Sequence, residues 1–272
     1  STINWTTTGT GTLSNAGTLT PSYMPSHNDA LAGSVTLTLT ANGAIPCAVA
    51  ATDIMQIVIT PTPIVSAGVN FSVCGGNSFI VPGASAQYYS SLNWTSSGTG
   101  TFVNANQINP TYTPSAADVA NGMVTLTLTA TGNAPCVAPV TSAILVTVNQ
   151  IPVVFAGNDI TICEGPHNVS GAIAANYDNL MWTSNGDGVF INPTVLNPIY
   201  TPGPGDLING LVTLTLSATS LAPCTDVVSD NVIFNINPLP LAYAGPNATI
   251  CEGDTYELIN ATASNYTSLA WS

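Results

Sequence analysis

Six cysteines carry the most distinctive chemistry of this sequence, because they occupy two recurring contexts. One set follows a proline: Cys47, Cys136 and Cys224. The other set ends a short run rich in β-branched residues: Cys74, Cys163 and Cys251. Paired cysteines at fixed positions, without a Cys-x-x-Cys motif or a histidine cluster, predict disulfides and argue against zinc. Because disulfides persist in oxidising compartments, the sequence predicts an extracellular protein.

Two disulfide pairings fit the spacing. Cys74 with Cys136 and Cys163 with Cys224 would close loops of 62 and 61 residues inside single domains, whereas Cys136 with Cys163 would bridge a junction over 27 residues. The loop entropies differ by less than about 1 kcal/mol, which does not separate the two pairings. We favour the internal pairs, because a domain with its own bridge folds independently. Cys47 and Cys251 would then pair outside these 272 residues.

Carboxylates are the other candidate ligands. The best-placed acids lie near predicted domain junctions: Asp159, Glu164, Glu252 and Asp254. Calcium takes six to eight oxygen ligands, and these acids are sparse. The first junction carries Val69, Asn70 and Gly75 instead. The sequence therefore predicts no metal and no cofactor, with calcium at these four acids as the alternative.

Catalytic groups do not converge in the sequence. The two histidines, His27 and His167, fall at unrelated positions of the repeat described below and are expected in loops. The chain contains no Lys or Arg, which excludes Schiff-base chemistry and arginine clamps on phosphoryl groups. We therefore expect no enzymatic activity.

Charge also restricts the partners. With 13 Asp plus Glu and no Lys or Arg, the formal net charge is −13. Binding to nucleic acids and to anionic membrane surfaces depends on basic side chains, so neither partner is expected. No run of eighteen apolar residues occurs, so no membrane insertion is expected either.

A tandem repeat must position all these residues. Tryptophans recur at spacings of 89, 88 and 89 residues, and both sets of cysteines recur at 89 and 88: Trp5, Trp94, Trp182 and Trp271 mark the period. Proline-rich connections divide the chain at about residues 63, 150 and 238. The predicted domains are 64–150 and 151–238, with a partial domain at 1–63 and another at 239–272.

Each repeat is predicted to be an all-β sandwich. The segment "VTLTLTA" alternates apolar residues with threonine, which is the period of a strand with one buried face. Within 64–150 we expect strands near "VNFSVC", "SFIVPGA", "SLNWTSS", "TGTFV", "INPTYT", "MVTLTLTA" and "AILVTVN". Seven short strands in fewer than ninety residues are typical of a sandwich. The four tryptophans are predicted to fill the cores.

One helical turn is expected between the sheets. In 64–150, Ser115 precedes Asp118 by three residues and Gly122 closes the segment, which is the pattern of a capped turn. Asp29 and Asp206 occupy the equivalent positions. All three aspartates are therefore predicted to cap a helix or hold a corner.

The motifs "AGNDITICEG", "WTSSGTGTF" and "PTYTPSAADVANGMVTLTLTA" resemble the PKD-like and Ig-like tandem repeats of very large surface adhesins of gliding Bacteroidetes, including the SprB type. The likeness extends through all copies of the repeat. It implies export by the type IX secretion system, attachment to the outer membrane, and a role in adhesion or gliding motility. It implies no active-site residues.

Three functional hypotheses follow. The first is a rigid, disulfide-stabilised and protease-resistant stalk, whose main partners are neighbouring repeats of the same chain. The second is a module array that binds polysaccharide, for which the tyrosines to inspect are Tyr88, Tyr89, Tyr177, Tyr243, Tyr256 and Tyr266. The third is a filament subunit that assembles with copies of itself.

Overall fold

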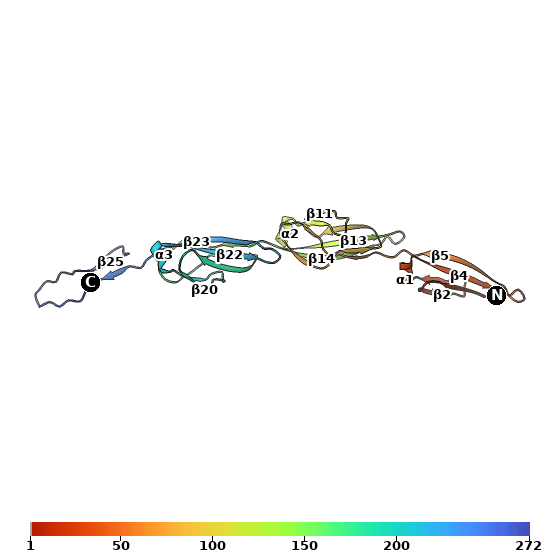
Figure 1. The fold of residues 1–272 in the computed structure, drawn as a ribbon, viewed down its shortest axis with the longest axis horizontal. Helices are drawn as coiled ribbons and strands as arrows, with labels where there is room; N and C mark the ends of the chain where they lie inside the picture. The colour runs from red at the N-terminus through yellow and green to blue at the C-terminus, as the bar shows by residue number, and fades with distance from the viewer. Residues whose placement is uncertain (1) are drawn as a thin grey trace. The chain divides into compact units, whose positions relative to one another are not determined.

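The structure is a computed structural model that describes residues 2–272. The chain divides into two compact units, Ser1–Val148 and Asn149–Ser272, which are described separately. The helices within the described residues are six residues long, and none is long and apolar enough to cross a membrane. Almost all other regular structure is strand, which confirms the predicted all-β fold class (Figure 1).

The first unit begins with an incomplete repeat. Its elements are β1 (Thr2–Thr7), β2 (Thr12–Ser14), β3 (Ser22–Met24), α1 (His27–Ala32), β4 (Ser34–Asn42) and β5 (Ala50–Val58). A complete repeat follows with β6 (Ile64–Ser66), β7 (Phe71–Cys74), β8 (Phe79–Ile80), β9 (Ser85–Gln87), β10 (Tyr89–Ser96), β11 (Thr101–Val103), β12 (Thr111–Thr113), α2 (Ala116–Asn121), β13 (Met123–Gly132) and β14 (Pro139–Asn149).

The second unit holds the other complete repeat and a short final segment. The repeat comprises β15 (Val153–Phe155), β16 (Ile160–Cys163), β17 (His167–Asn168), β18 (Ile173–Ala175), β19 (Tyr177–Ser184), β20 (Val189–Ile191), β21 (Ile199–Thr201), α3 (Pro204–Asn209), β22 (Leu211–Ser220) and β23 (Val227–Asn237). The final segment contains β24 (Leu241–Tyr243) and β25 (Thr262–Ser264).

Both complete repeats have the same topology, with two larger sheets and one two-stranded pair, which is β6-β9 in the first unit and β15-β18 in the second. In the second unit a four-stranded sheet has the order β16-β23-β22-β19, and a three-stranded sheet has the order β17-β21-β20. Strands β19, β22 and β23 pair antiparallel, whereas β16 joins the edge of β23 in parallel. The first unit repeats this as β10-β13-β14-β7 and β11-β12-β8. The strand predictions for 64–150 are therefore confirmed in order and position.

Alternation along the long strands builds the cores. In β22, Val212, Leu214 and Leu216 are buried while the intervening threonines face outward. The two sheets bury these residues against Trp182 and Tyr200. The equivalent cluster in the first unit includes Trp94. The period of two thus places the apolar residues of each strand inside and its hydroxyls in water.

The four tryptophans do not share one environment. Trp94 and Trp182 are each 2% exposed, and their indole N–H groups donate to the carbonyls of Gln107 and Leu196. Trp5 is half-buried. The prediction of a core role for Trp271 is wrong in this structure, where this side chain is 65% exposed. The reason is that residues 239–272 form only the β24–β25 pair, which supplies no second sheet to cover the indole.

Candidate functional site

A buried carboxylate ties together the corner between β12 and β13. Asp118 is 1% exposed and is the third residue of α2, in its first turn. Its Oδ2 atom accepts hydrogen bonds from the Tyr112 hydroxyl at 2.8 Å and from the backbone N–H groups of Gly100 and Ser115 at 2.9 and 3.0 Å. Its Oδ1 atom accepts from the Thr99 N–H at 3.0 Å. One side chain therefore holds the helix start and the β10–β11 loop together.

The same corner occurs in the other repeats. Asp29 accepts from the Tyr23 hydroxyl at 2.6 Å, and Asp206 accepts from the Tyr200 hydroxyl at 2.7 Å. The predicted capping or corner role of all three aspartates is confirmed. The repeated glycines of the loop are explained by close approach, because a Cβ atom at Gly98 would collide with the Asp118 carboxylate.

Opposing forces act on the pKa of Asp118. Burial raises it, because a charged carboxylate loses hydration, but hydrogen bonds from Ser115, Tyr112, Thr99 and Gly100 stabilise the charged form. The net result is a pKa below the ordinary value. The phenol of Tyr200 responds in the opposite direction: burial and the neighbouring Asp206 carboxylate raise its pKa to about 12.

The shifted pKa values at these corners predict that stability is constant over a middle range of pH and falls at both acidic and alkaline pH. Asp118 has a lowered pKa in the folded state, so its contribution is complete above about pH 4 and is lost as the pH falls through the folded pKa. Tyr200 has a raised pKa, so its contribution is complete below about pH 10 and is lost as the pH rises towards 12. Melting temperatures measured from pH 2 to pH 12 should therefore be highest and flat between these limits. A melting temperature that stays constant down to pH 2 would contradict the role of the carboxylate.

In the corner of the third repeat, two residues are replaced together, and one replacement makes up for the hydrogen bonds lost by the other. This was not predicted from the sequence. In the other two repeats a threonine and the N-cap serine are hydrogen-bonded through their hydroxyls, Thr10 with Ser26 and Thr99 with Ser115. The third repeat has Asp187 and Gly203 at these positions. Gly203 has no side chain for capping, and the Asp187 carboxylate accepts instead from the N–H groups of Gly205 and Asp206. The sequence signal is the joint loss of the serine and gain of the aspartate.

The cysteines lie at opposite ends of each sandwich, which overturns the predicted internal pairing. Cys163 is the register partner of Asn237 at the end of β23, whereas Cys224 precedes Val227 at its start. Eleven residues of strand extend about 33 Å, whereas the Cα atoms of a disulfide lie within about 7 Å. Cys163 and Cys136 are free thiols here, so neither Cys163–Cys224 nor Cys74–Cys136 is formed. The alternative Cys136–Cys163 bridge is absent for the same reason.

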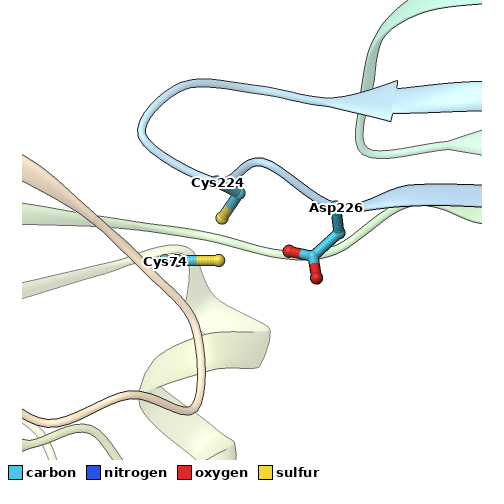
Figure 2. Close-up of side chains that lie close together, drawn as sticks. All are labelled: Cys74, Cys224 and Asp226. Atoms are coloured by element: carbon cyan, nitrogen blue, oxygen red, sulfur yellow. The ribbon is translucent and has the colours of Figure 1, made fainter.

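Two of the proline-flanked cysteines, Cys136 and Cys224, lie against a residue at or just after the end of the last strand of the preceding repeat. In the first unit the Cys136 sulfur is 3.4 Å from the carbonyl oxygen of Thr60. In the second unit the Cys224 sulfur is 3.7 Å from the carbonyl oxygen of Asn149. Cys224 extends from the loop between β22 and β23 (Figure 2). Cys74 and Cys224 are disulfide-bonded, and Cys47 and Cys251 are free thiols.

Two of the four predicted calcium candidates, Asp159 and Glu164, accept hydrogen bonds from backbone N–H groups. The Asp159 carboxylate accepts from the N–H of Ile233 at 2.8 Å, and Glu164 accepts from the N–H of Leu239 at 3.2 Å. Asn70 makes the bond equivalent to that of Asp159, to the N–H of Leu145 at 2.9 Å. The uncharged side chain of Asn70 thus makes the same hydrogen bond as the Asp159 carboxylate. Glu252 and Asp254 are exposed.

Grouped metal ligands are scarce in the described part of the chain. Residues 2–272 bring together one set of three His, Cys, Asp or Glu side chains, which consists of Cys74, Cys224 and Asp226 (Figure 2). Both cysteines are disulfide-bonded, so neither is the thiolate that binds a metal. None of the four calcium candidates belongs to this set.

Chelation is therefore expected to leave stability unchanged. Because Asp159 and Asn70 make equivalent bonds without an ion, adding EDTA should not lower the melting temperature, and adding millimolar calcium should not raise it. The Asp159→Asn variant, which copies the first complete repeat, should behave in the same way. A calcium-dependent rise in melting temperature that Asp159→Asn abolishes would contradict this expectation.

Histidines and tyrosines do not form a shared site. His27 begins α1, and His167 lies in β17 with its ring edge-on to Phe234 at 5.5 Å. Tyr88 and Tyr89 are half-buried, whereas Tyr243, Tyr256 and Tyr266 are exposed. Tyr177, also exposed, lines an open groove of about 590 Å³ with Met181 and Thr219. Trp271 and Tyr243 line another groove of about 460 Å³.

Comparisons with known proteins give a distant likeness. A scan against protein-family models found no matching family, and a search of curated proteins found no matching relative. Among solved structures, the chain is similar to Protocadherin Gamma B2 extracellular cadherin domains 3-6, at 12% identity over 86% of this chain and 67% of that chain, with a TM-score of 0.41.

Two further structures show the same level of similarity. The Protocadherin GammaB4 extracellular domain matches at 11% identity over 86% of this chain and 45% of that chain, with a TM-score of 0.42. Mouse clustered PcdhgC3 EC1-3 matches at 12% identity over 86% and 88%, with a TM-score of 0.39. These scores are too low to carry an argument about function, so the fold described above is based on the strand pairing itself.

Proposed function

We propose that this chain is a structural section of a long extracellular protein, in which β-sandwich repeats bear load between a cell surface and an adhesive partner. The observation that supports this most directly is the position of the two cysteines at opposite ends of each repeat. A disulfide between cysteines at the ends of neighbouring repeats would strengthen the connection between them. The main partners of each repeat are accordingly the neighbouring repeats of the same chain.

Composition supports an exposed location. The chain is rich in Thr, Ser and Asn and has no Lys or Arg. Trypsin cleaves after these two residues, so the chain offers it no site. A disulfide-bonded pair of cysteines, Cys74 and Cys224, is typical of an oxidising compartment.

The resemblance to surface adhesins narrows the proposal. Within it, the repeats form a rigid stalk of an outer-membrane-attached adhesin, exported by type IX secretion and used for adhesion or gliding motility. The repeats themselves have no enzymatic role in this proposal. They bind neither nucleic acid nor the membrane interior.

Electron microscopy of the purified secreted protein tests the structural role. A stalk should appear as single threads of equal beads, with a spacing that does not depend on protein concentration. Lateral bundles that grow with concentration would instead support the self-assembling filament. Antibodies against the repeats should label the surface of intact cells, and labelling confined to lysed cells would overturn the extracellular location.

The groove beside Tyr177 supports polysaccharide binding as a second candidate. It combines an exposed phenol ring with the polar side chains of Asp178, Asn179 and Thr219, and aromatic rings with nearby hydrogen-bonding groups suit sugar rings. A glycan array probed with the chain and with Tyr177→Ala distinguishes the two roles. Binding that this variant abolishes would favour the second candidate, and the absence of binding would favour the stalk.

A further inference from the structure

Cys74 and Cys163 each lie at the end of a strand and are called the strand-end cysteines; they have the same place in the two complete repeats. In the second unit, Cys163 lies in register with Asn237, four residues after the bond between Asp159 and Ile233. In the first unit, Asn70 bonds the N–H of Leu145 in the same way. Counting four residues onward on both strands places Cys74 beside Asn149.

The proline-flanked cysteines Cys136 and Cys224 lie in loops between paired strands and are called the hairpin cysteines. The hairpin cysteine of the repeat that follows Cys74, which is Cys224, contacts the same residue, Asn149. Thr60, Asn149 and Asn237 are equivalent, being 89 and 88 residues apart. The Cys136 sulfur contacts Thr60, and the Cys224 sulfur contacts Asn149. The residue that a strand-end cysteine flanks in its own repeat is therefore the residue that the next repeat's hairpin cysteine contacts.

We infer that every junction of this array is closed by a disulfide between the strand-end cysteine of one repeat and the hairpin cysteine of the next. Cys74 with Cys224 is the pair contained within these 272 residues, and both are disulfide-bonded. The other four cysteines are free thiols here. By the same rule, Cys47 and Cys136 pair with strand-end cysteines of preceding repeats, and Cys163 and Cys251 pair with hairpin cysteines of following ones.

Each bond requires an oxidant. Two thiols lose two protons and two electrons as the sulfur–sulfur bond forms, and a protein dithiol oxidase in its disulfide form accepts them and becomes a dithiol. Each bond joins two repeats, and the place of each cysteine at the end of its own folded repeat favours this pairing over the others.

Non-reducing peptide mapping of the 272-residue chain tests the pairing directly. Because the chain has no Lys or Arg, a protease that cleaves after acidic residues is combined with chymotrypsin. The expected result is one cross-linked peptide containing Cys74 and Cys224, with alkylation at the other four cysteines. A peptide joining Cys74 to Cys136, or Cys163 to Cys224, would overturn the inference.

A matched pair of variants tests whether Cys74, and not Cys163, is the disulfide partner of Cys224. Cys74→Ser should add one alkylatable thiol per chain, at Cys224, without reduction. Cys163→Ser, at the equivalent position of the next repeat, should leave Cys224 protected from alkylation. Exposure of Cys136 in place of Cys224 after Cys74→Ser would contradict the proposed pairing.

The array rule requires the secreted full-length protein. Alkylation without reduction should then modify none of the cysteines equivalent to Cys47, Cys136, Cys163 and Cys251, except at the two ends of the array. Stoichiometric alkylation at internal junctions would show that closure is not general and would overturn the rule.

Discussion

Replacing Asp206 by asparagine is expected to destabilise the third repeat by about 2–4 kcal/mol, because it removes charge-assisted bonds from a buried corner. Asp206 is 1% exposed, and one of its oxygens accepts from the Tyr200 hydroxyl and from the N–H groups of Gly188 and Gly203. An amide offers one acceptor oxygen. If that oxygen keeps these three bonds, the NH₂ group faces the N–H of Asp187, which donates to the other carboxylate oxygen at 3.3 Å. At least one buried donor then loses its partner.

Hydrogen exchange measured repeat by repeat checks this result, since a chain of several domains does not unfold in one step. Amides of β22 should exchange roughly 30-fold faster or more in Asp206→Asn, as about 2 kcal/mol implies. The control is Asp178→Asn, which makes the same chemical change at an exposed residue of the same repeat. Equal protection in both variants would refute the structural role of the corner.

Replacing Trp182 by alanine is expected to cost about 3–5 kcal/mol, the usual range for a large aromatic removed from a core. Trp182 is 2% exposed, packs near Phe190 at 6.1 Å between ring centroids, and donates its indole N–H to the carbonyl of Leu196. The alanine variant leaves a cavity and an unpaired carbonyl. Since domains are stable by about 5–15 kcal/mol, the third repeat would lose a large share of its stability and would open more often.

The chain provides its own control for this experiment. Trp271→Ala makes the same substitution at an indole that is 65% exposed, and it should change stability by less than about 0.5 kcal/mol. Limited proteolysis with chymotrypsin should therefore cleave 151–238 in the Trp182 variant only. Equal cleavage of both variants would show that the indole does not organise the core.

Strand order and the capped turn were predictable because their signals are local. The alternation of "VTLTLTA" predicts β13, and that of "VTLTLSA" predicts β22. The spacing of Ser115, Asp118 and Gly122 predicts α2 with its left-handed closing glycine. The three-residue strands β6 and β9, which pair antiparallel with each other, were not predicted. Strands β11 and β12 are equally short but were predicted, so length alone does not explain the difference.

The cysteine pairing was not predictable from loop lengths, because it depends on where a short strand joins the sheet. β16 pairs with the last four residues of β23, which places Cys163 at the far end of β23 from Cys224. Sequence spacing measures the chain between two residues and does not reveal which edge a four-residue strand joins.

Thr99 and Ser115 of one repeat correspond to Asp187 and Gly203 of the next, and this difference has a consequence for the evolution of the array. The two members of each pair lie 16 residues apart within one repeat. Unequal crossing-over that copies or deletes whole units therefore keeps each corner matched, whereas a breakpoint between the two positions would join a threonine to a glycine and leave the helix uncapped. Breakpoints in genes encoding such arrays should accordingly avoid the segment between these two positions, which are 16 residues apart.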